Sequence, residues 1–434
     1  MEKRLTVCGL LPMKICIFTN HFYPEDFKVN DIAFELARRG YDVTVITAVP
    51  DYPKGKFFDG YGWFRRSREE VNGCHVVRLP IIPRGKGGAK RLALQYLSYY
   101  ISSSAFTFIH KLFHKYDAVF VHLTSPFFIG LAATQLKRWQ KIPMLFWTLD
   151  LWPESITAAA GISHPLIIKP LTKQVQKVYD NCDAILIGSK GFEKSICEKG
   201  DYKDKCVYFP NWCESAELPE DVEKYRSVEP FASFTEKEFV VLFAGNIGEA
   251  QNLDCVIDAA VAIRETNPLV KFVFLGDGRA REHLVQKSAG NGILDKTVFF
   301  PGRFPIESMP YFMNKADVLL VSLKDELIFN LTVPSKMQFY MAQGKPILAM
   351  LNGDGSDLVR EANCGIAVPA NDVAAFTGAV QQTASMKEKE LSELGANGRQ
   401  FYERHFRKEQ RMEQLHEILK GAIDKDKEKT TRSP

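Results

Sequence analysis

The stretch Phe239–Leu253, which reads FVVLFAGNIGEAQNL, decides how this chain of 434 residues is divided. The apolar run Phe239–Phe243 predicts a buried strand, and glycines at positions 245 and 248 follow it directly. Glycines at a strand-to-helix turn let backbone N–H groups approach a phosphate closely. The same glycines also suit a tight turn that binds nothing, so both interpretations stay open at this point.

Strands alternate with helices on both sides of this stretch, which is the pattern of parallel sheets covered on both faces. In the first half the predicted strands are Lys14–Thr19, Asp42–Ile46, Val76–Leu79, Ala118–His122, Met144–Trp147, Ala184–Ile187 and Val207–Phe209. In the second half they are Phe239–Phe243, Lys271–Leu275, Val298–Phe300, Asp317–Ser322, Ile347–Met350 and Gly365–Val368. Since 434 residues exceed one ordinary core, we expect two Rossmann-like, doubly wound α/β domains, with the ligand in the cleft between them.

Composition shifts suggest where these domains begin and end. We place the first domain at residues 13–213 and the second at residues 239–385, joined by an acidic, proline-containing linker at 214–238. The charged stretch 386–421 predicts a C-terminal helix that packs back on the first domain. Residues 1–12 are expected to lie outside the fold, and the tail 424–434 is expected to be disordered.

Charge and cysteine usage exclude several classes of protein. Lysine and arginine number 56 against 52 acidic residues, and a net charge of +4 does not indicate a nucleic-acid partner. The 9 cysteines are scattered, with no CxxC pair and no histidine cluster at metal-ligand spacing. We therefore expect free thiols in a reducing, cytoplasmic compartment and no metal or other cofactor.

A second glycine turn, Leu275–Ala280, follows another predicted strand of the second half. It reads LGDGRA and lacks the third glycine of a dinucleotide fingerprint. A hydride-transfer enzyme is therefore not indicated.

The stretch Thr332–Pro346, TVPSKMQFYMAQGKP, lies between two predicted strands of the second half. Pro334 suits the first position of a helix and Gly344 suits the residue just past its end, which places Ser335 and Lys336 on the first turn. Free N–H groups, a positive helix dipole, a hydroxyl and an ammonium together make a clamp for a diphosphate. A surface helix that merely begins with Pro-Ser-Lys is the alternative.

Basic residues flank an apolar, aromatic run between positions 84 and 115. The basic residues are Arg84, Lys86, Lys90, Arg91, Lys111 and Lys115, and the aromatic residues are Tyr96, Tyr99, Tyr100, Phe106 and Phe108. Such a segment fits a helix lying at an anionic membrane surface, which Trp63–Arg66 would extend, and equally a core helix with solvated basic ends. Gln95 and four serines argue against a helix that spans the membrane.

Several motifs recur together in one order along the chain: Pro50-Asp51-Tyr52-Pro53 with Gly60-Tyr61, Asp150-Leu151-Trp152-Pro153-Glu154, Pro210-Asn211-Trp212, Gly245-Asn246-Ile247-Gly248 and Pro334-Ser335-Lys336. With these motifs the chain resembles the GT-B glycosyltransferases of family 4, the group 1 enzymes of bacterial polysaccharide synthesis, and within them the fucosamine-transferase-like branch. The resemblance implies retaining transfer of a sugar, such as an amino or deoxy sugar, from a nucleotide diphosphate donor, most often uridine diphosphate. It further implies a lipid-linked saccharide acceptor of capsule, O-antigen or exopolysaccharide synthesis, no metal, and a peripheral location on the inner face of the cell membrane.

The resemblance also assigns donor-binding residues to the second domain. They are Gly245, Asn246, Gly248, Gly276, Asp277, Arg303, Pro334, Ser335 and Lys336. Many family members carry two glutamates eight positions apart, which this chain replaces with Leu331 and Phe339. The usual ribose carboxylate is therefore missing, and Lys336 and Arg303 are expected to carry more of the phosphate charge.

Catalytic and acceptor-binding residues are assigned to the first domain. Asp150 and Glu154 follow a predicted strand and could orient or deprotonate an acceptor hydroxyl, although Asp150 also suits a cap. His122 lies near the position of a functional histidine in the family, with Thr124 as the alternative match and a purely structural role as another. Acceptor contacts are expected at the first loop, from Asn20, Tyr23 and Asn30.

Two other functions fit the same motifs. A nucleotide-sugar epimerase of the same fold would bind the donor similarly but would need no lipid acceptor. A non-catalytic sugar-binding subunit is suggested by the missing glutamates.

Overall fold

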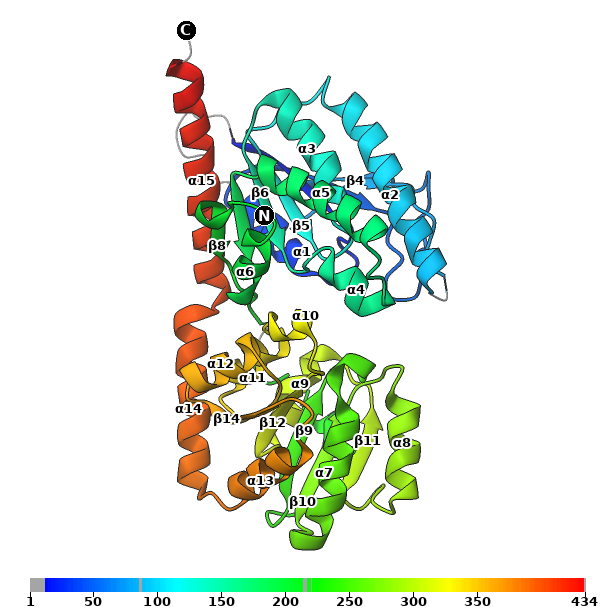
Figure 1. The fold of residues 1–434 in the computed structure, drawn as a ribbon, viewed down its shortest axis with the longest axis vertical. Helices are drawn as coiled ribbons and strands as arrows, with labels where there is room; N and C mark the ends of the chain where they lie inside the picture. The colour runs from blue at the N-terminus through cyan, green and yellow to red at the C-terminus, as the bar shows by residue number, and fades with distance from the viewer. Residues whose placement is uncertain (1–11, 86–87, 214–216, 220, 433–434) are drawn as a thin grey trace. The chain divides into compact units, whose positions relative to one another are not determined.

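The computed structural model of the chain describes residues 12–85, 88–213, 217–219 and 221–432. The chain divides into two compact units (Figure 1). Within the described residues, the first unit follows the bounds Met1–Gly188, Phe192–Phe209 and Met412–Pro434, and the second follows Ser189–Gly191 and Pro210–Arg411. Each unit holds one largely parallel sheet with helices around it, which confirms the predicted fold class.

The sheet of the first unit has the strand order β3-β4-β2-β1-β5-β6-β7-β8. Its strands are β1 Lys14–Thr19, β2 Asp42–Ala48, β3 Arg68–Val71, β4 Cys74–Leu79, β5 Ala118–Leu123, β6 Met144–Thr148, β7 Ala184–Ile187 and β8 Cys206–Tyr208. All neighbours pair in parallel except β3 and β4. The strand order reverses between β1 and β5, so the loops after these strands meet at the switch point where open α/β sheets bind ligands.

The helices of the first unit follow its strands in sequence. They are α1 Lys28–Arg38, α2 Ala89–His110, α3 Phe128–Gln140, α4 Glu154–Ala160, α5 Pro165–Asn181, α6 Gly191–Cys197, η1 Lys203–Lys205 and, from Met412 onward, α15 Lys408–Arg432. Arg39 pairs with Glu413 at 2.7 Å, and the Tyr41 hydroxyl lies 2.7 Å from His416 Nδ1. These contacts attach the end of the chain to the region after α1.

The sheet of the second unit is parallel, with the order β11-β10-β9-β12-β13-β14. Its strands are β9 Phe239–Ala244, β10 Val270–Leu275, β11 Val298–Gly302, β12 Val318–Ser322, β13 Ile347–Met350 and β14 Gly365–Val368. Its helices are η2 Glu223–Tyr225, η3 Glu249–Gln251, α7 Leu253–Thr266, α8 Arg281–Gly290, η4 Ile306–Ser308, α9 Met309–Asn314, α10 Leu327–Asn330, α11 Lys336–Gln343, α12 Asp354–Glu361, α13 Val373–Ala384 and α14 Glu388–His405. Here the switch point lies between β9 and β12.

Two apolar cores lie on the two faces of this second sheet. Val241 and Phe243 of β9 face a core shared with α7, α8 and α13, while Val240 and Leu242 face a core shared with α9, α11 and α12. Because both faces are covered, the strands carry continuous apolar runs and not alternating ones. This burial explains why the central strands could be read from the sequence.

Three predicted segments differ from the structure. Residues 214–216 and 220 of the predicted linker lie outside the described residues, but Tyr225 and Phe231 of the same stretch are buried in the second unit's core. The predicted single helix 386–421 is two helices, α14 and α15, and α15 extends to Arg432. The predicted disorder of residues 424–434 is therefore wrong up to position 432, and residues 433–434 are not described.

Other expectations fall partly outside the described chain. Of the predicted extension at residues 1–12, only Pro12 is described by the structure. Lys86 of the basic segment also lies outside the described residues. The edge strand β3 was not predicted, because its sequence, REEV, lacks an apolar run. Among the residues that the structure describes, no helix combines the length and apolar character that crossing a bilayer requires.

Candidate active site

The glycine loop after β9 packs backbone to backbone against the loop after β10. Gly245 N–H donates to Leu275 O at 2.9 Å, and Ile247 N–H donates to Asp277 O at 2.9 Å. A Cβ on Gly276 would lie 1.8 Å from Gly245 O, so only glycine permits this approach. The predicted donor-binding glycines 245 and 276 therefore lie together at the carboxyl ends of β9 and β10, beside the switch point.

The other predicted residues of these loops lie at the same edge of the sheet. Asn246 is exposed, and its side chain would lie 2.6 Å from a Cβ on Gly248. Asp277 is exposed, and its carboxylate accepts from the N–H of the next residue, Gly278, at 2.8 Å. Arg303 is exposed and directly follows β11, whose last carbonyl accepts from the neighbouring glycine loop at 2.8 Å. The two loops and β11 thus bring polar groups to one edge.

Lys336, on the first turn of α11, reaches this glycine loop. Its Nζ donates to Gln251 Oε1 at 2.6 Å, lies 3.8 Å from the centre of the Phe243 ring, and would be 3.4 Å from a Cβ on Gly245. Among the described residues no carboxylate pairs with this ammonium. Burial lowers the pKa of Lys336 to about 7. A cation held without a counter-charge beside a glycine loop is suited to an anionic ligand.

Tyr340 fixes α11 against β9. Its hydroxyl accepts from Ala244 N–H at 3.0 Å and donates to Ala244 O at 3.2 Å, while its ring is fully buried. Tyr340 lies one turn after Lys336 on α11. Its two hydrogen bonds to Ala244, the last residue of β9, therefore set the position of the Lys336 ammonium. The helix ends as predicted, with Gly344 in the left-handed conformation at φ 67°.

The start of α11 supplies further polar groups at the same edge. Ser335 is the exposed N-cap residue and Pro334 precedes it. The first N–H groups of a helix lack intrahelical partners and carry a partial positive charge. Together with Lys336, they form an anion-binding arrangement that fits a diphosphate. Leu331 and Phe339 are partly buried, and Phe339 packs against the core, so these positions offer no carboxylate.

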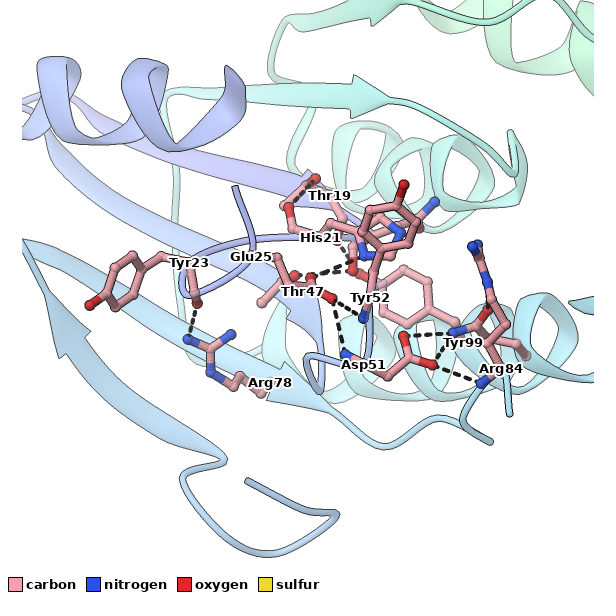
Figure 2. Close-up of polar contacts among 12 residues, drawn as sticks. Thr19, His21, Tyr23, Glu25, Thr47, Asp51, Tyr52, Arg78, Arg84 and Tyr99 are labelled. Atoms are coloured by element: carbon pink, nitrogen blue, oxygen red, sulfur yellow. Dashed lines mark hydrogen bonds and ion pairs between the residues drawn. The ribbon is translucent and has the colours of Figure 1, made fainter. Parts of the chain in front are cut away.

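In the first unit, the loop after β1 is organised around Glu25, which is buried (Figure 2). One carboxylate oxygen lies 3.0 Å from His21 Nδ1, and the other accepts from the N–H groups of Asp51 at 3.0 Å and Tyr52 at 2.7 Å. The His21 ring stacks on Phe27 with a centroid distance of 4.6 Å. These contacts hold the imidazole in one orientation at the carboxyl end of β1.

The ligand atoms of His21, Glu25 and Asp51 lie within 4.8 Å of one another. The Asp51 carboxylate already accepts from Gln95 Nε2 at 2.8 and 2.9 Å and from Arg84 N–H at 2.7 Å. Burial raises the pKa of Asp51. Since both carboxylates are occupied by N–H donors, a cation would have to displace hydrogen bonds that shape the loop, and the arrangement fits a structural network better than a metal centre.

The three predicted acceptor-binding residues separate into two groups. Asn30 caps the loop, because its Oδ1 accepts from Tyr23 N–H at 3.0 Å and its Nδ2 donates to Glu25 O at 2.7 Å. Tyr23 itself is 46% exposed, so its ring is available at the surface. Asn20 lies elsewhere, buried at the end of β1, where its Nδ2 donates to Ser125 O at 2.5 Å.

Asp150 follows β6 and is held by two serines. Its carboxylate accepts from the hydroxyls of Ser125 and Ser155, and Trp152 Nε1 donates to Ser125 Oγ at 2.9 Å. Burial raises the pKa of Asp150, and the two serine hydrogen bonds oppose this shift. Asn20, through Ser125, belongs to the same group, so the ends of β1, β5 and β6 converge on one polar cluster.

The other two predicted catalytic residues, Glu154 and His122, each contact side chains of the first unit. Glu154 accepts from Lys199 Nζ at 2.5 Å and from Ser195 Oγ at 2.9 Å, which joins α4 to α6. His122 is 1% exposed, and its Nδ1 lies 3.0 Å from Thr19 Oγ1. Burial lowers the pKa of His122 to about 3, so the ring stays neutral. Glu154 Oε2 and His122 Nε2 have no hydrogen-bond partner among the described residues, so the catalytic assignments of both side chains stay predictions.

The sequence reasoning missed the His21–Glu25 pair and the role of Tyr340. The pair lies within a loop that was noted, and its i, i+4 spacing is the only signal that could have joined the two residues. Tyr340 looked like any apolar helix residue, since its bond to Ala244 joins positions 96 apart.

Comparison with known proteins shows which families the two units resemble. Residues 28–212 match the family described as Glycosyl transferase 4-like domain, and residues 238–385 match Glycosyl transferases group 1. The chain is 28% identical to the probable glycosyltransferase WbjE of Pseudomonas aeruginosa over 59% of its own length and 63% of that relative. It is 26% identical to the putative colanic acid biosynthesis glycosyl transferase WcaI of Escherichia coli, over 76% of its own length and 82% of that relative.

Among solved structures, Anabaena HepE in complex with UDP and glucose superposes with a TM-score of 0.67 at 15% identity, covering 94% of this chain and all of that one. Two parallel-sheet α/β units of this kind are the GT-B fold, which the chain shares with these structures. The chain is a glycosyltransferase that carries a glycosyltransferase 4-like domain followed by a group 1 glycosyltransferase domain. These matches support a transferase and not the epimerase or the non-catalytic sugar-binding subunit that the sequence analysis also considered.

Proposed function

We propose that this glycosyltransferase moves a sugar from a uridine diphosphate sugar, bound by the second unit, to a lipid-linked saccharide in the synthesis of a bacterial surface polysaccharide. The observation that carries the proposal is Lys336, whose partly buried ammonium has no acidic partner among the described residues and lies against the Gly245 loop. The UDP bound to HepE and the colanic acid role in the name of WcaI support the donor and the pathway class.

The chemistry follows from the charge that develops on the leaving diphosphate. As the bond between the sugar and the phosphate breaks, negative charge grows on the diphosphate oxygens, and oriented cations and amides stabilise it. Lys336, the N-terminus of α11 at Ser335 and the Gly245 loop supply these groups, with Arg303 at the same edge. Because this charge comes from the protein, we propose that transfer needs no metal. Retention of the anomeric configuration is proposed on the family resemblance.

The acceptor is assigned to the carboxyl end of the first sheet. Asp150 and Asn20 both form hydrogen bonds with Ser125. His21 directly follows Asn20 in the chain, and Glu25 holds its ring in place. Carboxylate, amide and imidazole groups are the kinds of side chain that hold sugar hydroxyls. We assign Asp150 to orienting the acceptor hydroxyl.

A binding screen tests the donor assignment. Uridine, guanosine and thymidine diphosphates and their sugars are titrated against the unaltered protein, Lys336→Gln and the matched control Lys345→Gln. Lys345 is also partly buried, but its Nζ donates to Ala316 O at 2.7 Å and lies at the other end of α11. We expect selective binding of uridine diphosphate compounds that weakens at least about tenfold in Lys336→Gln only.

The transfer itself is tested with lipid extracts as acceptor and the donor that binds. Product formation that persists with a chelator present, and an unchanged anomeric coupling constant by NMR, are the expected results. Turnover of the donor into another sugar nucleotide without acceptor would refute the transferase mechanism. Failure of all the nucleotides to bind would refute the donor site.

A further inference from the structure

Three residues from within the first unit's stretch of chain belong to the second unit. The chain leaves the first unit after Gly188, which follows β7, and returns to it at Phe192. The segment between them is Ser189–Gly191. Its first and last residues each make a hydrogen bond within the second unit, one to the chain before α11 and one to the start of α12. The segment therefore contacts the part of the second unit that carries Lys336.

Ser189 binds the chain directly before α11. Ser189 is 1% exposed, and its Oγ accepts from Val333 N–H at 2.5 Å, across 144 positions of sequence. Pro334, the next residue, has no N–H to donate. In the described part of the chain, the other hydrogen bonds of residues 331–333 run back to α10. The Ser189 hydroxyl thus ties this stretch to a distant element.

The other end of the segment is attached to α12. Gly191 N–H donates to Oδ2 of Asp354 at 2.5 Å, and Asp354 is the first residue of α12, where the helix dipole favours a carboxylate. A Cβ on Gly191 would lie 2.8 Å from Asp354 Oδ1 and 3.0 Å from Leu331 Cδ2. The backbone of the segment is therefore in close contact with both neighbours, which limits how far Ser189 can move.

The start of α12 also contacts the chain before α11. A Cβ on Gly353, whose φ is 68°, would lie 1.9 Å from Asn330 O, so the two backbones touch at this glycine. A Cβ on Gly355 would lie 3.4 Å from Pro334 Cδ. Residues 330–334 are thus packed against α12 and hydrogen-bonded to the Ser189–Gly191 segment.

The position of Lys336 depends on how the first turn of α11 is held. Tyr340 fixes the helix one turn later, through two hydrogen bonds to β9. The first N–H groups of a helix have no intrahelical partners, so a first turn frays unless groups outside the helix hold it. Ser189 supplies such a contact just before the N-cap. With Ser189 before the turn and Tyr340 after it, the Lys336 ammonium is held 2.6 Å from Gln251 Oε1.

We propose that Ser189 is a positioning residue for the donor site: by accepting from Val333 N–H it holds the first turn of α11, and thereby the Lys336 ammonium, against the Gly245 loop. The inference rests on the proposed donor site and deepens it. Without the hydroxyl, Val333 N–H loses its partner and other conformations of the stretch gain population. Donor affinity then falls with the fraction of molecules that keep the present geometry.

Two measurements test this role. Calorimetry gives the affinity for uridine diphosphate of the unaltered protein, Ser189→Ala, Ser189→Thr, Lys336→Gln and the double variant Ser189→Ala/Lys336→Gln. Hydrogen exchange followed by mass spectrometry reports the order of residues 331–337 without any nucleotide. The matched control is Ser288→Ala, because Ser288 is also buried in the second unit but its Oγ donates to Leu284 O at 2.8 Å, within α8.

We expect Ser189→Ala to bind uridine diphosphate about tenfold more weakly and to exchange the amides of residues 331–337 about tenfold faster. Ser189→Thr keeps an acceptor oxygen and should recover most of both losses, and Ser288→Ala should show neither. In the Lys336→Gln background, Ser189→Ala should weaken binding by less than about threefold, because the ammonium that Ser189 positions is already absent.

Equal losses of affinity on removing the Ser189 hydroxyl with and without Lys336 would overturn the proposal, since the effect would not pass through the ammonium. Unchanged exchange in Ser189→Ala, or the same losses in Ser288→Ala, would also overturn it. If Lys336→Gln binds weakly and Ser189→Ala normally, only the positioning role fails. If the unaltered protein binds no nucleotide, the proposed donor site fails, and the exchange data alone decide whether Ser189 orders the chain before α11.

Discussion

Donor affinity should fall as the pH rises above 7, and the reason is Lys336. Burial lowers the pKa of this lysine to about 7, whereas an exposed lysine stays charged to pH 10. A diphosphate beside the ammonium favours its protonated form, so the bound state holds a proton that the free state has partly lost. Raising the pH therefore weakens binding.

The magnitude follows from the protonated fraction of free Lys336. With a pKa of about 7, half of the molecules carry the charge at pH 7 and roughly one in eleven at pH 8. If only the charged form binds, affinity falls about fivefold over this interval and about tenfold for each further pH unit until the pKa of the complex is reached. The affinity should be nearly constant below pH 6.

Calorimetric titration with a uridine diphosphate sugar between pH 6 and 9 measures this effect, because a diphosphate diester keeps its charge throughout the range. Lys336→Gln should bind more weakly by about 2 kcal/mol, roughly thirtyfold, and should show no such pH dependence. An affinity of the unaltered protein that is constant from pH 6 to 9 would refute the reasoning. So would a pH dependence that survives in the variant.

Three further predictions concern residues that build the site. Tyr340→Phe should lower the free energy of unfolding by about 1–3 kcal/mol in urea titration, because a buried backbone N–H loses its partner, and stability equal to the parent would contradict this. Gly276→Ala should cost more than about 3 kcal/mol and abolish donor binding, whereas Gly290→Ala, where a Cβ meets nothing within 4 Å, should be nearly neutral. Glu154→Gln should destabilise the protein by about 3 kcal/mol by leaving Lys199 buried without its counter-charge, while activity per folded molecule is retained; loss of activity in a fully stable variant would support the catalytic assignment of Glu154.

The sequence specified the sheets well because their central strands are buried on both faces. Strands such as Lys14–Thr19 and Ala184–Ile187 coincide with their predicted bounds, since continuous apolar runs bounded by turns have few other solutions. The edge strand β3 escaped detection because it has no buried face to impose a pattern. The tail was misjudged because its many charged residues resembled disorder, although α15 continues to Arg432.

The candidate site was predictable where it follows from local chemistry. Pro334, Ser335 and Lys336 were read as a helix start, and Gly245 as a strand-to-helix turn, because helix capping and glycine turns are set by neighbouring residues. The contacts of Glu154 and His122 could not be predicted, because both involve distant partners. Glu154 meets Lys199, 45 positions away, and His122 meets Thr19, 103 positions away.

The sequence by itself thus determined two tandem α/β domains and the segments that we propose as the diphosphate site, since periodicity and turn chemistry act over a few residues. Tertiary structure alone decided that Lys336 is partly buried beside Gly245, with no counter-charge among the described residues, and that Tyr340 fixes it there. It also decided that α2 presents its apolar side to solvent, because the hydrogen bonds that turn its polar side inward come from Asp51 and Thr19, far along the chain. Which side chains are buried, and which groups they form hydrogen bonds with, depend on packing between elements, and no local pattern encodes this packing.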